Sequence, residues 1–181
     1  MSLMPSPSPP CGCAAPAGRR HVLSLLAGGA GALMLGAAVP HLALAAAGTD
    51  TLLLSCMDYR LMDKIAAFMD GRGLAANYDH VVLAGASIGV ATDAKPDWRH
   101  TFWEHLAIAR DLHHVSRVMV IDHRDCGAYR LILKKDLTGE AELAAHARML
   151  HRLRRAVAEK YPKLQTELLF MELDGSTRAI A

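Results

Sequence analysis

The sequence predicts an α/β fold with a mostly parallel central sheet flanked by helices. Short apolar runs, which are typical of buried strands, alternate along the chain with longer segments whose apolar residues recur at helical spacing. Such alternation is typical of units in which a helix connects two parallel strands. With 181 residues the chain is long enough for one such domain, and we find neither an internal repeat nor a second domain.

Four segments have the composition of strands. The first (TLLLS) and the second (DHVVLA) are apolar runs that we expect to be buried on both faces. The third (RVMVID) and the fourth (TELLFMEL) are also rich in β-branched or apolar side chains. In chain order these strands are expected over residues 51–55, 79–84, 117–122 and 166–173.

Helical spacing predicts the segments between the strands. The first helix, over residues 61–69, ends before Gly71. The longest, over residues 98–113, carries Phe102, Leu106, Ala109 and Leu112 on one face. A short helix starts at Leu131 and Ile132, and a long basic helix is expected over residues 140–160, before Pro162.

Residues 1–47 resemble a cleaved export signal of the twin-arginine type. They contain no acidic residue, and a Pro/Ser-rich start is followed by Arg19 and Arg20. A Gly-loosened apolar run then ends in small residues, as before an Ala-x-Ala cleavage site. A membrane anchor is the alternative, but the run is short for a span. We therefore expect a periplasmic protein, without stable membrane insertion after cleavage, whose single domain covers residues 48–181.

The charge of that domain is balanced. Removing the two leader arginines from the 20 basic residues of the chain leaves as many basic as acidic residues, 18 of each. A nucleic-acid groove requires a basic stripe that such a balance does not suggest. We therefore expect a small-molecule substrate rather than a nucleic-acid partner.

Two short motifs follow two of the predicted strands and carry the chemistry. The segment CMDYR, residues 56–60, follows the first strand, and HRDC, residues 123–126, follows the third. Since the carboxyl ends of parallel strands meet at one sheet edge, Cys56, His123 and Cys126 are expected to lie together there. Two thiolates and one imidazole suit a zinc site with one open position. A disulfide between the two cysteines, or two buried thiols without a ligand, are the alternatives.

Asp58 and Arg60 are two residues apart and share a side of extended backbone. An arginine beside a carboxylate forms a bidentate pair and keeps the acid ionised. One interpretation is an acceptor aimed at a nucleophile in the metal site, with Asp58 able to become the fourth metal ligand in a second state. The other interpretation is a structural ion pair.

Together, Cys56-x-Asp58-x-Arg60, a Gly/Ala loop over residues 84–89 and His123-x-Asp125-Cys126-Gly127 resemble the β-class carbonic anhydrases over roughly residues 51–173. The resemblance implies Zn²⁺ on Cys56, His123 and Cys126, with Asp58 and Arg60 as the catalytic pair. It also implies reversible hydration of carbon dioxide to bicarbonate by a metal-bound hydroxide, and a homodimer.

Two other functions remain open from the sequence. The same zinc site could hydrolyse carbonyl sulfide or carbon disulfide, or Asp58 could close it permanently in a non-catalytic metal-binding module. This chain also departs from the family pattern, because Arg124 stands where a small Ser or Thr is usual, which predicts a bulkier, more positive rim.

Ser87 lies in a Gly-x-Ser-x-Gly segment, which also occurs at the nucleophile elbow of serine hydrolases. Because residues 92–96 look like a loop rather than the required helix, we expect Ser87 instead in a tight loop near the metal, where it could hydrogen-bond an anion. Four histidines are expected at solvated helix positions: His100, His105, His146 and His151.

Overall fold

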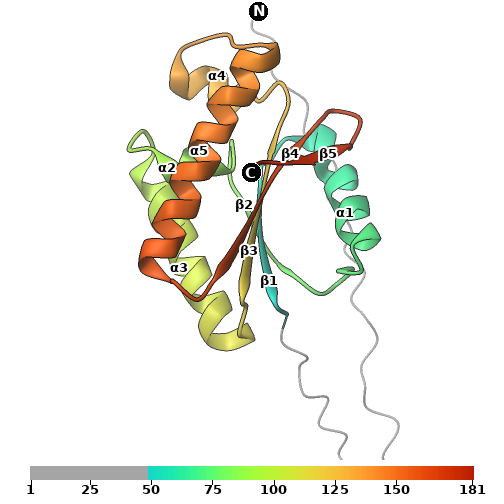
Figure 1. Cartoon of the computed structure of the whole chain (residues 1–181), viewed down its shortest axis with the longest axis vertical. Helices are drawn as coiled ribbons and strands as arrows, with labels where there is room; N and C mark the ends of the chain where they lie inside the picture. The colour runs from blue at the N-terminus through green and yellow to red at the C-terminus, as the bar shows by residue number, and fades with distance from the viewer. Residues whose placement is uncertain (1–48) are drawn as a thin grey trace, which may run out of the picture. The chain divides into compact units, whose positions relative to one another are not determined.

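The computed structural model describes residues 49–181, so the predicted leader, residues 1–47, lies outside the described residues. A five-stranded sheet with the order β2-β1-β3-β4-β5 forms the centre (Figure 1). The first four strands are parallel, and β5 pairs antiparallel with β4. The strands are β1 (Thr51–Ser55), β2 (Asp79–Val82), β3 (Arg117–His123), β4 (Gln165–Met171) and β5 (Thr177–Ala179).

Helices cover both faces of this sheet. On one side lies α1, and on the other lie α2, α3 and α5 (Figure 1). The helical segments are η1 (Tyr59–Leu61), α1 (Met62–Gly71), α2 (Ser87–Ala91), α3 (Pro96–His113), α4 (Gly127–Leu133) and α5 (Gly139–Lys160). Among residues 49–181, no helix has both the length and the apolar character needed to cross a membrane. The α/β class and the mostly parallel sheet predicted from the sequence are confirmed.

The core is divided by the sheet into two apolar layers. Val118 and Val120 of β3 pack toward α3 and α5, whereas the intervening Met119 packs toward α1. This alternation follows from the two-residue period of a strand, and the apolar run of β3 exists because both of its faces are covered. A third cluster contains both cysteines and packs against α2, α4 and α5.

Several elements differ from the sequence prediction. The second strand is the sheet edge rather than a fully buried strand, and its Val82 is 41% exposed. Leu112 is 68% exposed, because it lies in the last turn of α3, one turn beyond the buried Ala109. The short helix α4 starts at Gly127 rather than at Leu131. Three-residue β5 has too short a pattern to be predicted.

Phe102 tests the packing of α3. Its side chain is fully buried, so Phe102→Ala is expected to lower the free energy of unfolding by about 3–5 kcal/mol. Ile108→Ala on the same helix is the matched control, because Ile108 is 53% exposed and its loss should change stability by about 0.5 kcal/mol or less. Denaturant unfolding followed by circular dichroism measures both. Equal losses for the two variants would contradict the described orientation of α3.

Candidate metal centre

Parallel pairing of β1 with β3 brings the two sequence motifs together. Ser55, the last residue of β1, is in register with Ile121 of β3. Cys56 therefore follows β1 at the level where β3 ends in His123. A tight turn after β3 then places Cys126 as the residue that precedes α4. All three residues lie at the carboxyl edge of the sheet, as the sequence predicted.

The three side chains form a compact, buried group. One ligand atom of each, the Sγ of Cys56 and Cys126 and a ring nitrogen of His123, lies within 4.8 Å of the others. The residues are 4%, 5% and 1% exposed, respectively, so water does not solvate them freely. Both cysteines are free, which argues against the alternative of a disulfide. This is a group that could hold a metal ion.

His123 supplies the observation that tests whether a metal fits. Its Nδ1 lies 2.8 Å from the carbonyl oxygen of Arg124, so Nδ1 carries the proton and donates it there. In the neutral imidazole its Nε2 then bears the lone pair, and this atom is buried and has no hydrogen-bond partner. A buried polar atom without a partner is unfavourable, whereas a metal-binding imidazole has this arrangement, with one nitrogen held by a carbonyl and the other free to coordinate.

The two thiols also favour a cation. Contact with Cys126 lowers the pKa of Cys56, and contact with Cys56 raises the pKa of Cys126. The second thiol resists ionisation because two thiolates would repel each other in a buried place. A divalent cation removes that repulsion, and thiolates together with imidazole are ligands that zinc prefers. The donor set therefore fits a zinc ion.

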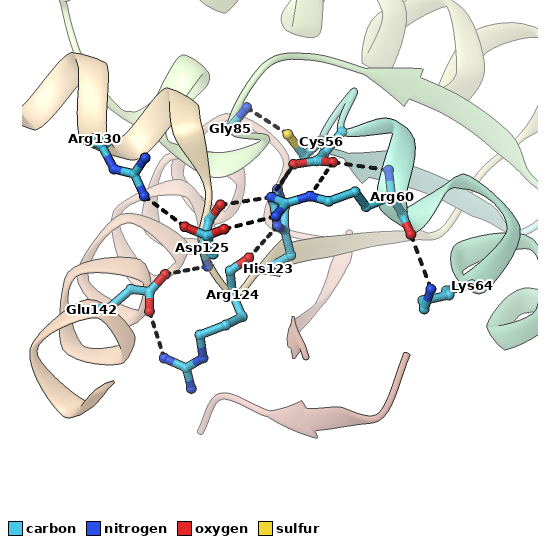
Figure 2. A network of polar contacts seen from close by, with 10 residues as sticks. Cys56, Arg60, Lys64, Gly85, His123, Arg124, Asp125, Arg130 and Glu142 are labelled. Atoms are coloured by element: carbon cyan, nitrogen blue, oxygen red, sulfur yellow. Dashed lines mark hydrogen bonds and ion pairs between the residues drawn. The ribbon is translucent and has the colours of Figure 1, made fainter. Parts of the chain in front are cut away.

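The turn at Gly85 and Ala86 is strained and holds the thiol of Cys56 through a hydrogen bond. Gly85 donates its backbone N–H to Cys56 Sγ over 3.2 Å (Figure 2). Its φ is +74°, and an added Cβ would lie 2.6 Å from Ile88 and 2.9 Å from Ala128, so only glycine fits. The next residue, Ala86, has φ 43° and ψ −102°, a conformation that costs a non-glycine residue roughly 1–3 kcal/mol.

Asp58 is held by Arg60 beside this group. Arg60 donates its Nε–H to Asp58 Oδ1 over 2.9 Å and an Nη2–H to Oδ2 over 2.7 Å, while its backbone N–H also reaches Oδ1. The hydrogen bonds from Arg60 lower the pKa of Asp58 to about 2. Asp58 Oδ2 lies 4.0 Å from His123 Nε2. The predicted pairing is therefore present, with the carboxylate at the margin of the Cys–His–Cys group.

Asp125 completes this arrangement and was not assigned a role from the sequence. Its Oδ2 and its carbonyl oxygen accept hydrogen bonds from Arg60 over 2.8 and 2.9 Å (Figure 2). Its backbone N–H donates to Glu142, and its Oδ1 accepts from Arg130. Asp125 has a positive φ of 56°. Arg60 thus joins the two motifs, a connection that depends on tertiary structure and that motif spacing does not contain.

Arg124 does not add to the rim of the centre the free positive charge that the sequence predicted. Arg124 lies between two carboxylates, with Nη1 2.8 Å from Glu142 and Nε 2.9 Å from Glu172. It also stacks over the ring of Phe170. The prediction that Arg124 makes the rim more positive is therefore wrong, because these carboxylates neutralise its guanidinium and Arg124 does not line the open cleft beside the centre. Exposed apolar side chains border that cleft, namely Met57, Tyr59 and Leu131.

Two further predictions need correction. Ser87 is not in a loop near an anion site, because it begins α2 and is fully buried, with hydrogen bonds to Asp122 and Tyr129. A helix does follow it, yet its burial still excludes a nucleophile. His146 is not solvated, because it lies on the inward stripe of α5, is 0% exposed and bonds Asp122.

These features define a small α/β protein with a Cys–His–Cys group at the carboxyl edge of its sheet and a carboxylate–guanidinium pair beside it. Residues 46–180 match a family model described as "Putative carbonic anhydrase", and the chain belongs to this family.

Two similar curated proteins come from Rickettsia. An uncharacterized protein of Rickettsia conorii is 38% identical over 132 residues, which cover 72% of this chain and 71% of that protein. Another of Rickettsia bellii is 36% identical over 127 residues, or 69% of this chain and 77% of that protein.

Two similar solved structures are carbonic anhydrases. The carbonic anhydrase from Glaciozyma antarctica is 22% identical with a TM-score of 0.45, over 74% of this chain and 83% of that chain. The β-carbonic anhydrase CafD of Aspergillus fumigatus is 17% identical with a TM-score of 0.49, over 74% of this chain and 90% of that chain.

Metal content tests the centre directly. We predict that the zinc-loaded full chain holds one zinc ion at this group, and that Cys126→Ser loses most of it because a buried thiolate ligand is removed. Elemental analysis after exhaustive dialysis measures the stoichiometry. Cys13→Ser, in the segment predicted to be a leader, is the matched control and should leave the content unchanged. Equal zinc loss in both variants, or none in Cys126→Ser, would count against this centre.

Proposed function

We propose that the chain catalyses the reversible hydration of carbon dioxide, in which water and carbon dioxide give bicarbonate and a proton, with zinc as cofactor. The observation that carries the proposal is the buried, unpartnered Nε2 of His123, which lies with two thiols beside a carboxylate fixed by Arg60. Membership of the carbonic anhydrase family supports the same reaction.

Cys56, His123 and Cys126 would hold the zinc ion. Zinc in such a site lowers the pKa of a bound water toward neutrality and so supplies a nucleophile at physiological pH. The three residues lie where bulk water is largely excluded, since each is at most 5% exposed. In such surroundings charges interact more strongly than they do in water.

Asp58 orients the nucleophile in this proposal. Arg60 keeps its carboxylate ionised, so Asp58 acts only as a hydrogen-bond acceptor at its margin of the centre. An acceptor selects an oxygen nucleophile that carries a hydrogen and fixes the direction of its lone pair. Arg60 positions Asp58 through two parallel hydrogen bonds and is itself held by Asp125. Arg60 and Arg130, which both pair with Asp125, also line the open cleft beside the centre.

Stopped-flow measurement of carbon dioxide hydration by the zinc-loaded full chain tests the reaction. Catalysis that disappears with chelation and returns with zinc supports the proposal. Hydrolysis of carbonyl sulfide or carbon disulfide without hydration of carbon dioxide would assign the site to the sulfur-bearing substrates instead. Zinc binding without any of these activities would leave a non-catalytic metal module.

The Asp58–Arg60 pair gives a second prediction. Asp58→Ala and Arg60→Ala are expected to keep their zinc, because the three main ligands remain, but to lose activity by roughly ten- to a thousandfold. Arg72→Ala is the matched control, since Arg72 pairs with Glu167 in an exposed ion pair away from the centre. Rates and zinc content of the purified variants are measured together. Wild-type rates in both pair variants would mean that the pair is structural only.

Activity is predicted to rise with pH through neutrality. The pKa of Asp58 is lowered to about 2 and that of Arg60 is raised, so neither side chain titrates between pH 5 and 9, roughly the range of the assay. Because its pKa is lowered, Asp58 contributes stability that is fully present above the ordinary carboxyl pKa. This contribution declines as the pH falls below that value and is lost as the pH falls through about 2. The rate should therefore follow ionisation of the nucleophile alone.

A closed state at low pH is the structural counterpart. As the competing nucleophile is depleted, Asp58 would leave Arg60 and become the fourth zinc ligand. Crystal structures of the zinc-loaded protein below and above neutrality measure this change. Asp58 paired with Arg60 at both pH values, together with a flat pH–rate profile, would rule out the switch.

We also propose a homodimer. The apolar side chains of Met57, Tyr59 and Leu131 are 63%, 86% and 80% exposed beside the centre, and an apolar patch of this kind is typical of a contact surface. Sedimentation equilibrium of the wild-type protein and of Leu131→Glu tests this assembly. A monomeric wild-type protein at micromolar concentration would contradict it.

Export to the periplasm completes the proposal. It is supported by the order of features in residues 1–47, a paired arginine followed by a Gly-rich apolar run and small residues. Replacement of Arg19 and Arg20 by Lys should retain the protein in the cytoplasm of a bacterial host, as measured by cell fractionation. Unchanged fractionation would exclude the twin-arginine route.

A further inference from the structure

A buried carboxylate lies directly behind the metal centre. Asp122 precedes His123 on β3 and is 1% exposed. Its Oδ2 accepts hydrogen bonds from Ser87 Oγ at 2.6 Å, from Tyr129 Oη at 2.6 Å and from His146 Nδ1 at 2.9 Å. Its Oδ1 accepts from the backbone N–H of Ser87 at 3.0 Å. Asp122 on β3 thus connects α2, α4 and α5.

The first connection leads to Cys56. Asp122 binds both the backbone N–H and the hydroxyl of Ser87, which fixes the first residue of α2. That residue follows Ala86, whose φ of 43° and ψ of −102° are strained, and Ala86 follows Gly85, which donates to Cys56 Sγ. The two hydrogen bonds to Asp122 therefore hold the strained turn in the shape that aims the Gly85 N–H at the thiol.

The second connection leads to Cys126. Tyr129 lies in the first turn of α4, the helix that begins directly after Cys126. Its hydroxyl is bonded to Asp122, and its ring stacks on His146 with centroids 3.5 Å apart and an interplanar angle of 27°. The His146 ring also contacts Phe170 of β4 edge to face. These contacts fix the position at which α4 starts and hence the position of the Cys126 thiol.

The hydrogen bonds to Asp122 fix the arrangement of the segments around it more than they stabilise the fold. Burial of a charged carboxylate is unfavourable, and apolar side chains of similar volume often stabilise a core as well or better. A carboxylate with four donors, however, accepts only one arrangement of the segments that carry those donors. Asp122 adjoins His123 on β3 and bonds Tyr129 in the helix that follows Cys126. It also bonds Ser87, which closes the turn whose Gly85 donates to Cys56.

We propose that Asp122 is a positioning residue that pre-forms the metal centre, by fixing the turn before Ser87 and the start of α4 so that Cys56, His123 and Cys126 converge. This inference rests on the proposed function only in that the centre binds zinc. The side-chain hydrogen bonds of Asp122 go to Ser87, Tyr129 and His146 rather than to the three proposed ligands, so its effect reaches the centre through Ser87 and Tyr129. None of the sequence motifs includes it.

Zinc affinity of the full chain is the test, measured by competition with a chromophoric chelator. Asp122→Asn keeps the size of the side chain but places an NH₂ group against donors, so zinc should bind about 10- to 100-fold more weakly. Tyr129→Phe keeps the ring and removes one hydrogen bond, so its loss should be smaller and in the same direction. The visible absorption spectrum of the Co²⁺-loaded variants should also shift, because the ligands are displaced.

Val157→Ala is the matched control. Val157 is fully buried on α5 and packs in the apolar layer away from Asp122, so its truncation lowers thermal stability without altering the centre. Its zinc affinity should stay within about twofold of wild type. That change is far smaller than the one expected when Asp122 no longer positions the ligands. Affinity that falls equally in Val157→Ala would mean that zinc binding tracks stability alone, which would overturn the inference.

The remaining outcomes are also distinguishable. The inference would be overturned if both Tyr129→Phe and Asp122→Asn bound zinc with wild-type affinity and the Co²⁺ spectrum of Tyr129→Phe were unchanged. The proposed function would then remain intact. A wild-type chain that binds no zinc would overturn both. If Asp122→Asn does not fold, Tyr129→Phe and Ser87→Ala decide by the same measurements, because each removes one donor to the carboxylate.

Discussion

The parallel register between β1 and β3 is the constraint on which the rest of the site depends. Ser55 pairs with Ile121, so Cys56 and His123 reach the same edge of the sheet from motifs that are more than sixty residues apart in the printed sequence. A shift of one residue would turn the side chains of one strand to the opposite face. The apolar layers on both sides of β3 oppose such a shift, since Val118 and Met119 are both fully buried on opposite faces.

Polar side chains then organise the edge that the sheet defines. Arg60 ties Asp58 to Asp125, and Arg124 ties Glu142 to Glu172, so that charges around the centre are paired. This pairing explains how a domain with balanced charge keeps several ionised groups close to one cleft. The one buried polar atom beside the thiols that lacks a partner is Nε2 of His123, among the residues the structure describes. A buried lone pair that faces two thiols and has no partner is what a metal-binding centre requires.

The sequence predicts the elements and site residues correctly where these depend on local or periodic patterns. The strand TLLLS, the buried face of α3 up to Ala109 and the two motifs at strand ends each follow from residue spacing, and the structure confirms them. It was insufficient where a residue's role depends on a distant partner. His146 looked solvated because α5 is basic overall, but its stripe faces Asp122. Likewise, the neutralisation of Arg124 depends on Glu172, which lies on a different strand end. The edge position of β2 depends on strand order, which apolar runs do not encode.

X-ray absorption at the zinc edge of the loaded full chain tests the central claim most directly. The account predicts two sulfur ligands at about 2.3 Å and nitrogen or oxygen ligands at about 2.0–2.1 Å in a four-coordinate site. This result would place the ion on Cys56, Cys126 and His123. A shell of four sulfur atoms would instead assign the zinc to a set that includes Cys11 and Cys13, the other two cysteines of the chain. A shell of nitrogen and oxygen alone would exclude both thiols. Either of these results would contradict the account.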